Sequence, residues 1–317
     1  MRRIHVVAAV IEHDGKVLIA RRPQHLYQGG KWEFPGGKVE PGEAPMAALA
    51  RELKEELNLE LAQAQPLIKI AHDYPDKQVL LDVWRVTDFA GTAEGMEGQS
   101  VRWVEREQLP DYEFPAANGP IVTAARLPRH YVISPPNITQ AEPLLRQWQQ
   151  LLERGERLFQ LRCKQINDRA LATLVEQLQP MIERFDAQVL VNSDMPTWVQ
   201  SRFQGVHLTA AALRAMEPGR EVGKRPDMPW LAASCHNREE LEQAQGLGVD
   251  FVTLSPLRVT ASHPGQPPLS RQDFERWVLG ANVPVFALGG VGPGDRSEVA
   301  ALGAQGVAGI SAFWGSV

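Results

Sequence analysis

The sequence predicts two domains of different architecture: an α+β sandwich over residues 1–128 and a compact (β/α)8 barrel over residues 129–317. A chain of 317 residues corresponds to about two domains on length alone. The apolar rhythm changes after His130, from strands grouped around one helix to short strands that alternate with helical stretches. Proline interrupts the periodicity at residues 126–130 (RLPRH), where we expect the domains to meet.

The first domain is predicted from strand groups on both sides of one helix, which is typical of a sandwich of helix and sheet. The helix is expected over residues 45–57 (PMAALARELKEEL). The expected strands are residues 5–12, 16–22, 31–37, 78–86 and 99–104.

The second domain is predicted from eight short apolar runs, which is the strand count of a (β/α)8 barrel. The runs are residues 130–135, 158–164, 188–194, 205–208, 230–236, 251–256, 284–290 and 306–311. Amphipathic stretches such as 142–155 and 237–248 separate most of them. About 190 residues is short for a fold of typically about 250, so some connecting helices must be short.

The overall charge and the cysteine content exclude several classes of function. A net charge of −5 gives no basic field for a nucleic-acid backbone or an anionic membrane, so neither is an expected partner. Cys163 and Cys235 show no metal-site spacing, which favours a reducing, cytoplasmic location. The apolar run near the N-terminus is broken by Glu12, His13 and Asp14, and it predicts a β-hairpin instead of a signal peptide or a membrane span.

The predicted helix crowds three carboxylates onto one face. Glu52, Glu55 and Glu56 lie three and four residues apart, and like charges at this spacing cost about 0.2–0.5 kcal/mol per pair. Either solvent screens the repulsion, with Arg51 and Lys54 as partners on an exposed face, or a cation binds among the carboxylates. Arg51 can pair with Glu55 or reach back to Glu43.

The spacing around these carboxylates resembles the Nudix box, the signature of a superfamily of Mg²⁺-dependent diphosphate hydrolases. The matching positions are Gly37, Glu43, Arg51, Glu52, Leu53, Glu55, Glu56 and Leu59. Asn58 stands where the family has glycine, and asparagine is the usual second choice for a left-handed residue at a helix end. The resemblance implies an α/β/α sandwich with a mixed sheet. It also implies a catalytic site for Mg²⁺, with Mn²⁺ as a substitute, made by Arg51 and by the metal ligands Gly36 (through its carbonyl), Glu52, Glu55, Glu56 and Glu97.

Beyond the box, the first domain resembles the MutT branch of this superfamily, the 8-oxo-dGTP diphosphatases. The similar segments are residues 21–22, 31–43, 74–76 and 114–122. By position, the resemblance makes Asn118 the base reader, places Leu80 or Leu81 near the base, and lines the nucleotide pocket with Arg22, Phe34 and Asp76. Phe34 could equally belong to the core.

The chemistry of Asn118 agrees with this role. A carboxamide offers a donor and an acceptor side by side, which fits N7–H and O6 of 8-oxoguanine but not the two acceptors of guanine. The competing interpretation is a turn residue before Gly119 and Pro120. The implied reaction is attack of water on the diphosphate bridge, giving a nucleoside monophosphate and pyrophosphate, with Glu52, Glu55 or Glu56 as the base. A diphosphate of thiamine metabolism is the alternative substrate, prompted by the second domain.

The second domain resembles the thiamine phosphate synthase and TenI-like barrels. Gln160, Arg162 and Lys164 match a diphosphate-binding strand of the synthases, and alternation places them on one face. The implied phosphate cradle after the last two strands is Gly289, Gly290, Gly309 and Ser311. A phosphorylated small molecule is therefore the expected ligand.

The second domain departs from the synthases in its expected metal ligands. The first acidic ligand is displaced to Asp194, and alanines at 210–212 replace the second. Thr260, Ser262 and His263 occupy a loop where the synthases have Thr-x-Thr-Lys. We therefore expect no complete synthase activity.

Two histidines of the second domain have different expected roles. His236 resembles the acid–base histidine of the TenI-like tautomerases, and an imidazole that titrates near neutrality suits that work. His207 is expected to be a packed barrel residue. The domain is either a tautomerase-like enzyme or a phosphate-binding module without turnover.

Overall fold

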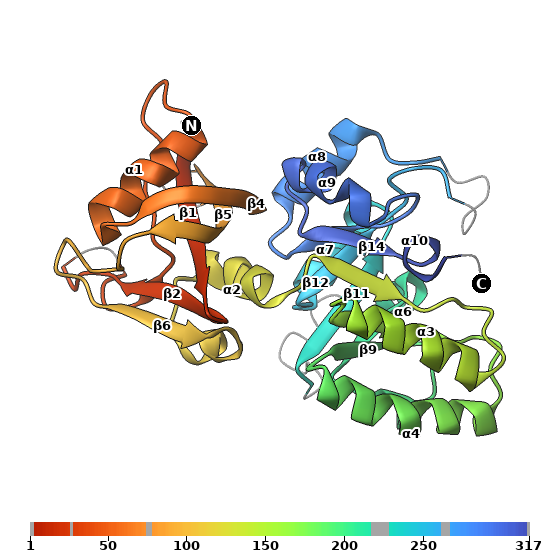
Figure 1. Ribbon diagram of the computed structural model, residues 1–317. Coiled ribbons are helices and arrows are strands. Elements are labelled where there is room, and N and C mark those ends of the chain that lie inside the picture. Colours follow the sequence, from red (N-terminus) through yellow and green to blue (C-terminus); the bar gives the residue numbers. More distant parts are fainter. Residues whose placement is uncertain (1–2, 26–27, 74–77, 217–227, 261–266, 316–317) are drawn as a thin grey trace. The chain divides into compact units, whose positions relative to one another are not determined.

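The computed structural model describes residues 3–25, 28–73, 78–216, 228–260 and 267–315. The chain separates into two compact units, with the first running to Leu127 and the second beginning at Pro128 (Figure 1). None of the helices in these described ranges combines the length and the apolar character needed to cross a lipid bilayer.

The first unit is built on a mixed six-stranded sheet. Its strands are β1 (Arg3–His13), β2 (Lys16–Arg21), β3 (Trp32–Glu33), β4 (Glu60–Asp73), β5 (Gln78–Ala90) and β6 (Val101–Glu105). The order is β3-β2-β1-β5-β4, with β6 paired to β2. β1 and β5 are parallel, while β1–β2 and β4–β5 are antiparallel.

Alternation along β1 sends side chains into an apolar layer on each face of this sheet. Val7, Ala9 and Ile11 pack with Leu49 and Leu53 of helix α1 (Pro45–Leu57). The opposite set packs against helix α2 (Gly119–Arg126), which follows the 3-10 turns η1 (Arg106–Asp111) and η2 (Ala116–Asn118). The predicted α/β/α sandwich is confirmed.

The strand β4 is not predicted from the sequence. Pro66 interrupts its pattern, and register shifts between Leu61 and Ile68 break the alternation that marks a strand. The strand tolerates proline because it lies at the edge of the sheet.

The second unit is a closed eight-stranded parallel barrel, as predicted. Its strands are β7 (His130–Ile133), β8 (Leu158–Leu161), β9 (Gln188–Asn192), β10 (Gly205–Leu208), β11 (Trp230–Cys235), β12 (Phe251–Leu254), β13 (Val285–Ala287) and β14 (Gly306–Gly309). Tyr131, Phe251 and Phe286 meet with ring centroids 5.3–5.7 Å apart, and all three are fully buried.

The helices of the barrel vary in length, and several are short as expected. They are α3 (Ala141–Glu153), α4 (Asp168–Arg184), α5 (Thr197–Gln200), α6 (Ala210–Ala215), α7 (Arg238–Gly246), α8 (Arg271–Gly280), α9 (Arg296–Ala301) and α10 (Ser311–Trp314), with the turn η3 (Pro293–Asp295) before α9. Side chains of Asn167, Thr209 and Asn237 accept backbone N–H bonds at the starts of α4, α6 and α7. These caps set where the helices begin after their strands.

Candidate functional site

The carboxylate face of α1 is organised by one arginine. Arg51 binds both oxygens of Glu43, each at 3.0 Å, and donates to Glu52 at 2.9 Å and to Glu55 at 3.2 Å. It also donates to the carbonyl of Lys38 at 3.1 Å, which fastens the helix to the preceding loop. Both contacts considered from the sequence, to Glu43 and to Glu55, are therefore made at once. The hydrogen bond from Arg51 lowers the pKa of Glu43.

The C-terminal end of α1 contacts the loop that carries Glu97, the fourth predicted acidic ligand. Asn58 ends the helix in the left-handed conformation, with φ 56°, as its place in the motif predicted. Backbone N–H groups of Glu94 and Met96 then donate to the free carbonyls of Leu57 and Glu56, at 3.2 and 2.9 Å. The side chain of Gln99 donates to the Glu56 carbonyl as well, at 2.9 Å.

Glu56 lies at the centre of an acidic cluster. Its carboxylate accepts the N–H of Gly36 at 3.1 Å. Burial, together with the charges of Glu33, Glu52 and Glu97, raises the pKa of Glu56 to about 8, although the hydrogen bond from Gly36 acts in the opposite direction. The structure thus brings Glu97, from a loop forty residues away in the sequence, into the electrostatic range of α1.

The carboxylates fit a hard divalent cation in chemistry, although they do not converge on one point. Within the described residues, no three acidic, histidine or cysteine side chains are close enough together to hold a metal ion. Three of the carboxylates are instead held by the protein: Glu52 and Glu55 by Arg51, and Glu56 by Gly36. Oxygen donors of this kind suit Mg²⁺, and a cation beside a buried carboxylate favours its charged form.

Two glycines let the loop approach this cluster closely. A Cβ on Gly36, which has φ 147°, would lie 2.1 Å from the carbonyl oxygen of Val7. A Cβ on Gly37 would lie 2.3 Å from the carboxylate of Glu52. The glycines are therefore required by contacts within the protein, with β1 and with α1.

A pocket of about 290 Å³ opens beside the cluster, and it brings together most of the predicted nucleotide-binding residues. Among those lining it are Arg22, Phe34, Gly36, Leu81 and Asn118. Leu81 faces the pocket and Leu80, on the opposite face of β5, does not line it. Phe34 lines this pocket and also belongs to the core, where it stacks on Phe114 with ring centroids 5.2 Å apart. Asp76 lies outside the described residues.

Asn118 is the residue before α2, yet its side chain makes no capping hydrogen bond. Asn118 is among the residues that line the pocket. Glu33 was missed by the sequence analysis: it forms an ion pair with Arg22 at the pocket wall, and burial raises its pKa. The only sequence signal for that pair was the closeness of the two residues on adjacent predicted strands.

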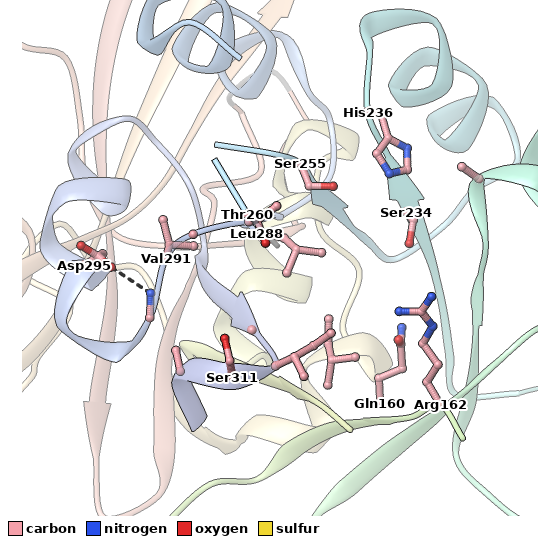
Figure 2. Close-up of a pocket in the computed structure, with 18 of the residues that line it drawn as sticks. Gln160, Arg162, Ser234, His236, Ser255, Thr260, Leu288, Val291, Asp295 and Ser311 are labelled. Atoms are coloured by element: carbon pink, nitrogen blue, oxygen red, sulfur yellow. Dashed lines mark hydrogen bonds between the residues drawn. The ribbon is translucent and has the colours of Figure 1, made fainter. Parts of the chain in front are cut away.

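The mouth of the barrel forms a second pocket, of about 670 Å³. Predicted residues that line it are Gln160, Arg162, His236, Gly289, Gly290, Gly309, Ser311 and Thr260 (Figure 2). Lys164 is not among them and lies 3.8 Å from Asp194. The expected alternation fails there because β8 ends at Leu161. Ser262 and His263 lie outside the described residues.

The glycine turn after β13 already contains an internal anion. Gly289 and Gly290 have φ values of 94° and 68°, and a Cβ on either would come within 2.8 Å of the segment after β12. The N–H of Gly292, two residues after Gly290, donates to Asp295 at 2.8 Å, and this bond lowers the pKa of Asp295 (Figure 2). Arg258 pairs with the same carboxylate at 2.9 Å.

The mouth does not bring together the two carboxylates of a synthase metal site within the described residues. Asp194 is about half exposed and pairs with Lys164. Thr209 stands at the start of the alanine segment, where its hydroxyl accepts the N–H of Ala212 at 3.1 Å as a helix cap. The donor set of this pocket therefore fits an anion better than a cation.

His236 and His207 lie in different environments. Glu240 accepts from the backbone N–H of His236 at 2.8 Å and lies 3.0 Å from its Nδ1, while also pairing with Arg214. Sequence analysis missed Glu240, which is buried one helical turn after His236. His207 is buried, with partners on both ring nitrogens, and burial lowers its pKa to about 3.

Comparison with known protein families gives two matches in one chain. Residues 130–313 match the family described as thiamine monophosphate synthase, and residues 6–124 match the NUDIX domain. A CTP pyrophosphohydrolase of Escherichia coli is 41% identical over 39% of this chain and 92% of its own length. An 8-oxo-dGTP diphosphatase of the same organism is 33% identical over 38% of this chain and 95% of its own length. A putative thiamine-phosphate synthase 2 of Aquifex aeolicus is 32% identical over 59% of this chain and 98% of its own length.

The raised pKa of Glu56 predicts a pH-dependent stability in the presence of a chelator. An acid whose folded pKa lies near 8 and whose unfolded pKa lies near 4.5 destabilises the fold as pH rises between these values, because the unfolded chain loses the proton first. Glu56→Gln should therefore raise the midpoint of thermal unfolding at pH 8 by a few degrees, and leave it unchanged at pH 4. Glu60→Gln, an exposed neighbour, is the control; equal effects of the Glu56 variant at both pH values would contradict the assignment.

Proposed function

We propose that the first domain of this chain hydrolyses 8-oxo-dGTP to 8-oxo-dGMP and pyrophosphate. The chain belongs to the Nudix hydrolases over residues 6–124 and to the thiamine monophosphate synthase family over residues 130–313. Its relatives support a nucleoside triphosphate pyrophosphohydrolase. The proposal assigns this reaction to residues 1–128 and a phosphate-ligand site to residues 129–317.

The observation that carries the proposal is the position of Gly36. Its N–H binds the carboxylate of Glu56, and Gly36 also lines the pocket that contains Asn118. The acidic cluster and the carboxamide are thus joined by one residue of the pocket wall. A triphosphate whose base reaches Asn118 has its phosphates directed towards α1.

Mg²⁺ would be held by Glu52, Glu55, Glu56, Glu97 and the carbonyl of Gly36, and Mn²⁺ could replace it. When bound, the metal neutralises the negative charge of the phosphate oxygens. Arg51 keeps the acidic face ordered through Glu43, so the helix presents its carboxylates in one arrangement. One of the three helical glutamates accepts the proton of the attacking water.

In the proposed nucleotide site, Asn118 selects 8-oxoguanine over guanine. Its amide can accept N7–H of 8-oxoguanine and donate to O6, whereas guanine presents an acceptor at both positions. The N3 and N4 edge of cytosine also offers an acceptor beside a donor, so the same amide suits a cytosine nucleotide. The 41% identical CTP pyrophosphohydrolase makes CTP the second candidate substrate. A diphosphate of thiamine metabolism is the other candidate substrate, and it is prompted by the second domain.

The barrel is proposed to bind a phosphorylated small molecule without a metal ion. Arg162 and Ser311 carry donor groups and line its mouth, and among the described residues the two synthase carboxylates are not assembled there. His236, oriented by Glu240, is the acid–base group if the domain turns its ligand over. Loss of turnover in His236→Ala with binding retained would separate a tautomerase-like enzyme from a binding module.

Asn118→Ala should lower kcat/KM for 8-oxo-dGTP about 10- to 100-fold more than for dGTP, because only the oxidised base uses both groups of the amide. Steady-state pyrophosphate release with Mg²⁺ measures both substrates, with CTP as a third. Asn167→Ala, which changes a helix cap in the second domain, is the control. Equal losses on 8-oxo-dGTP and dGTP would mean that Asn118 only shapes its loop.

Calorimetry with the full chain tests the barrel. Inorganic phosphate should bind in the presence of EDTA, and Arg162→Ala should weaken that binding about tenfold or more, because a charge-assisted contact is lost. Arg169→Ala, at an exposed helical position, should leave binding unchanged. Absence of binding to the wild-type chain would refute a phosphate site in this mouth.

A further inference from the structure

Four polar side chains form one hydrogen-bonded chain beneath the mouth of the barrel. Nε2 of Gln160 (β8) donates to the hydroxyl of Tyr131 (β7) at 3.3 Å. That hydroxyl lies 3.0 Å from Nδ1 of His207 (β10), and Nε2 of His207 lies 2.9 Å from Oγ of Ser234 (β11). Gln160 and Ser234 line the pocket, whereas Tyr131 and His207 do not. The chain therefore crosses the barrel interior from one pocket-lining residue to another.

Both inner members of the chain are uncharged over the ordinary pH range. His207 is 1% exposed, and burial together with the charge of Arg162 lowers its pKa to about 3. Tyr131 is fully buried, which raises the pKa of its hydroxyl. A neutral imidazole has one N–H and one acceptor nitrogen, so its tautomer sets the direction of every hydrogen in the chain.

The contact made by Gln160 selects the tautomer. Because the Tyr131 oxygen accepts from Gln160, its own hydrogen is donated to Nδ1 of His207, which leaves the imidazole hydrogen on Nε2. With the hydrogen on Nδ1, the buried Tyr131 hydroxyl would have no acceptor among the described residues. Such an unsatisfied buried donor is costly. The opposite direction requires the Gln160 amide to turn its oxygen towards Tyr131, where the structure places nitrogen.

In this arrangement Ser234 is a donor to the pocket. Nε2–H of His207 occupies one lone pair of Oγ, so the hydroxyl hydrogen of Ser234 is available to the cavity. Figure 2 shows Ser234 with Gln160 and Arg162 at the same pocket. We propose that Tyr131 and His207 are positioning residues that fix Ser234 as a hydrogen-bond donor to an anionic oxygen of the ligand. This inference rests on the proposed phosphate site of the barrel.

The tautomer can be measured without any ligand. Long-range ¹H–¹⁵N spectra of the full chain should show His207 with its hydrogen on Nε2, and unchanged between pH 5 and pH 8. In Tyr131→Phe, which removes one oxygen and keeps the ring, the nitrogen shifts of His207 should move as Nδ1 loses its donor. A wild-type spectrum with the hydrogen on Nδ1 would overturn the proposal even if no variant folds.

The functional consequence is tested with inorganic phosphate and EDTA. Ser234→Ala and Tyr131→Phe should each weaken binding to the full chain severalfold, and the double variant no more than Ser234→Ala alone, because the two act through one hydrogen. Tyr112→Phe, the same change in the first unit, is the matched control. Additive losses, or normal binding in Tyr131→Phe beside weakened binding in Ser234→Ala, would refute the positioning role. No binding to the wild-type chain would refute the phosphate site, while the tautomer measurement still decides the direction of the chain.

Discussion

Crowding of negative charge on one face of α1 is the constraint on which the first unit depends. Arg51 contacts Glu43, Glu52 and Glu55 together, so a single cation compensates three of the carboxylates. Among the described residues, the carboxylate of Glu56 accepts a hydrogen bond from the backbone N–H of Gly36, and its pKa is raised by burial first and by the neighbouring carboxylates second. The apolar face of the same helix fixes it on the sheet, so packing and electrostatics act on one element.

The barrel meets a related constraint with neutral groups. Its interior contains His207, Tyr131 and Gln160, which are costly to bury unless they are bonded to each other. Their chain ends at the pocket, so satisfying the interior also arranges donors for a ligand. Within the described residues, the mouth offers one lining carboxylate, Asp295, which Gly292 and Arg258 already hold.

Most of the fold was predictable because its elements carry local patterns. The eight barrel strands are short apolar runs between amphipathic stretches, and each becomes a strand. β4 was missed because Pro66 and several register shifts disrupt its alternation, and its identity as an edge strand depends on pairing with β5. The prediction that Lys164 shares the pocket face with Gln160 and Arg162 was wrong, because strand alternation holds only within a strand and β8 ends at Leu161.

The site was predictable where a motif fixes the spacing along one helix. The contacts of Arg51 with Glu43 and Glu55 follow from that spacing. Partners that come from other elements left no local signal. The pairing of Glu240 with Arg214 depends on how separate strands and helices are assembled, and so does the hydrogen-bonded chain through Tyr131.

A catalytic role for the acidic face of α1 is tested by the rate of 8-oxo-dGTP hydrolysis by the wild-type chain and by Glu52→Gln, with Mg²⁺. We expect magnesium-dependent release of pyrophosphate by the wild type and a fall in kcat of about 10²–10⁴-fold or more in the variant, with the fold intact. Glu60→Gln, an exposed neighbour beyond the end of α1, should keep wild-type activity. Near-normal turnover in Glu52→Gln would show that the acidic face of α1 is a solvated surface and not a catalytic site.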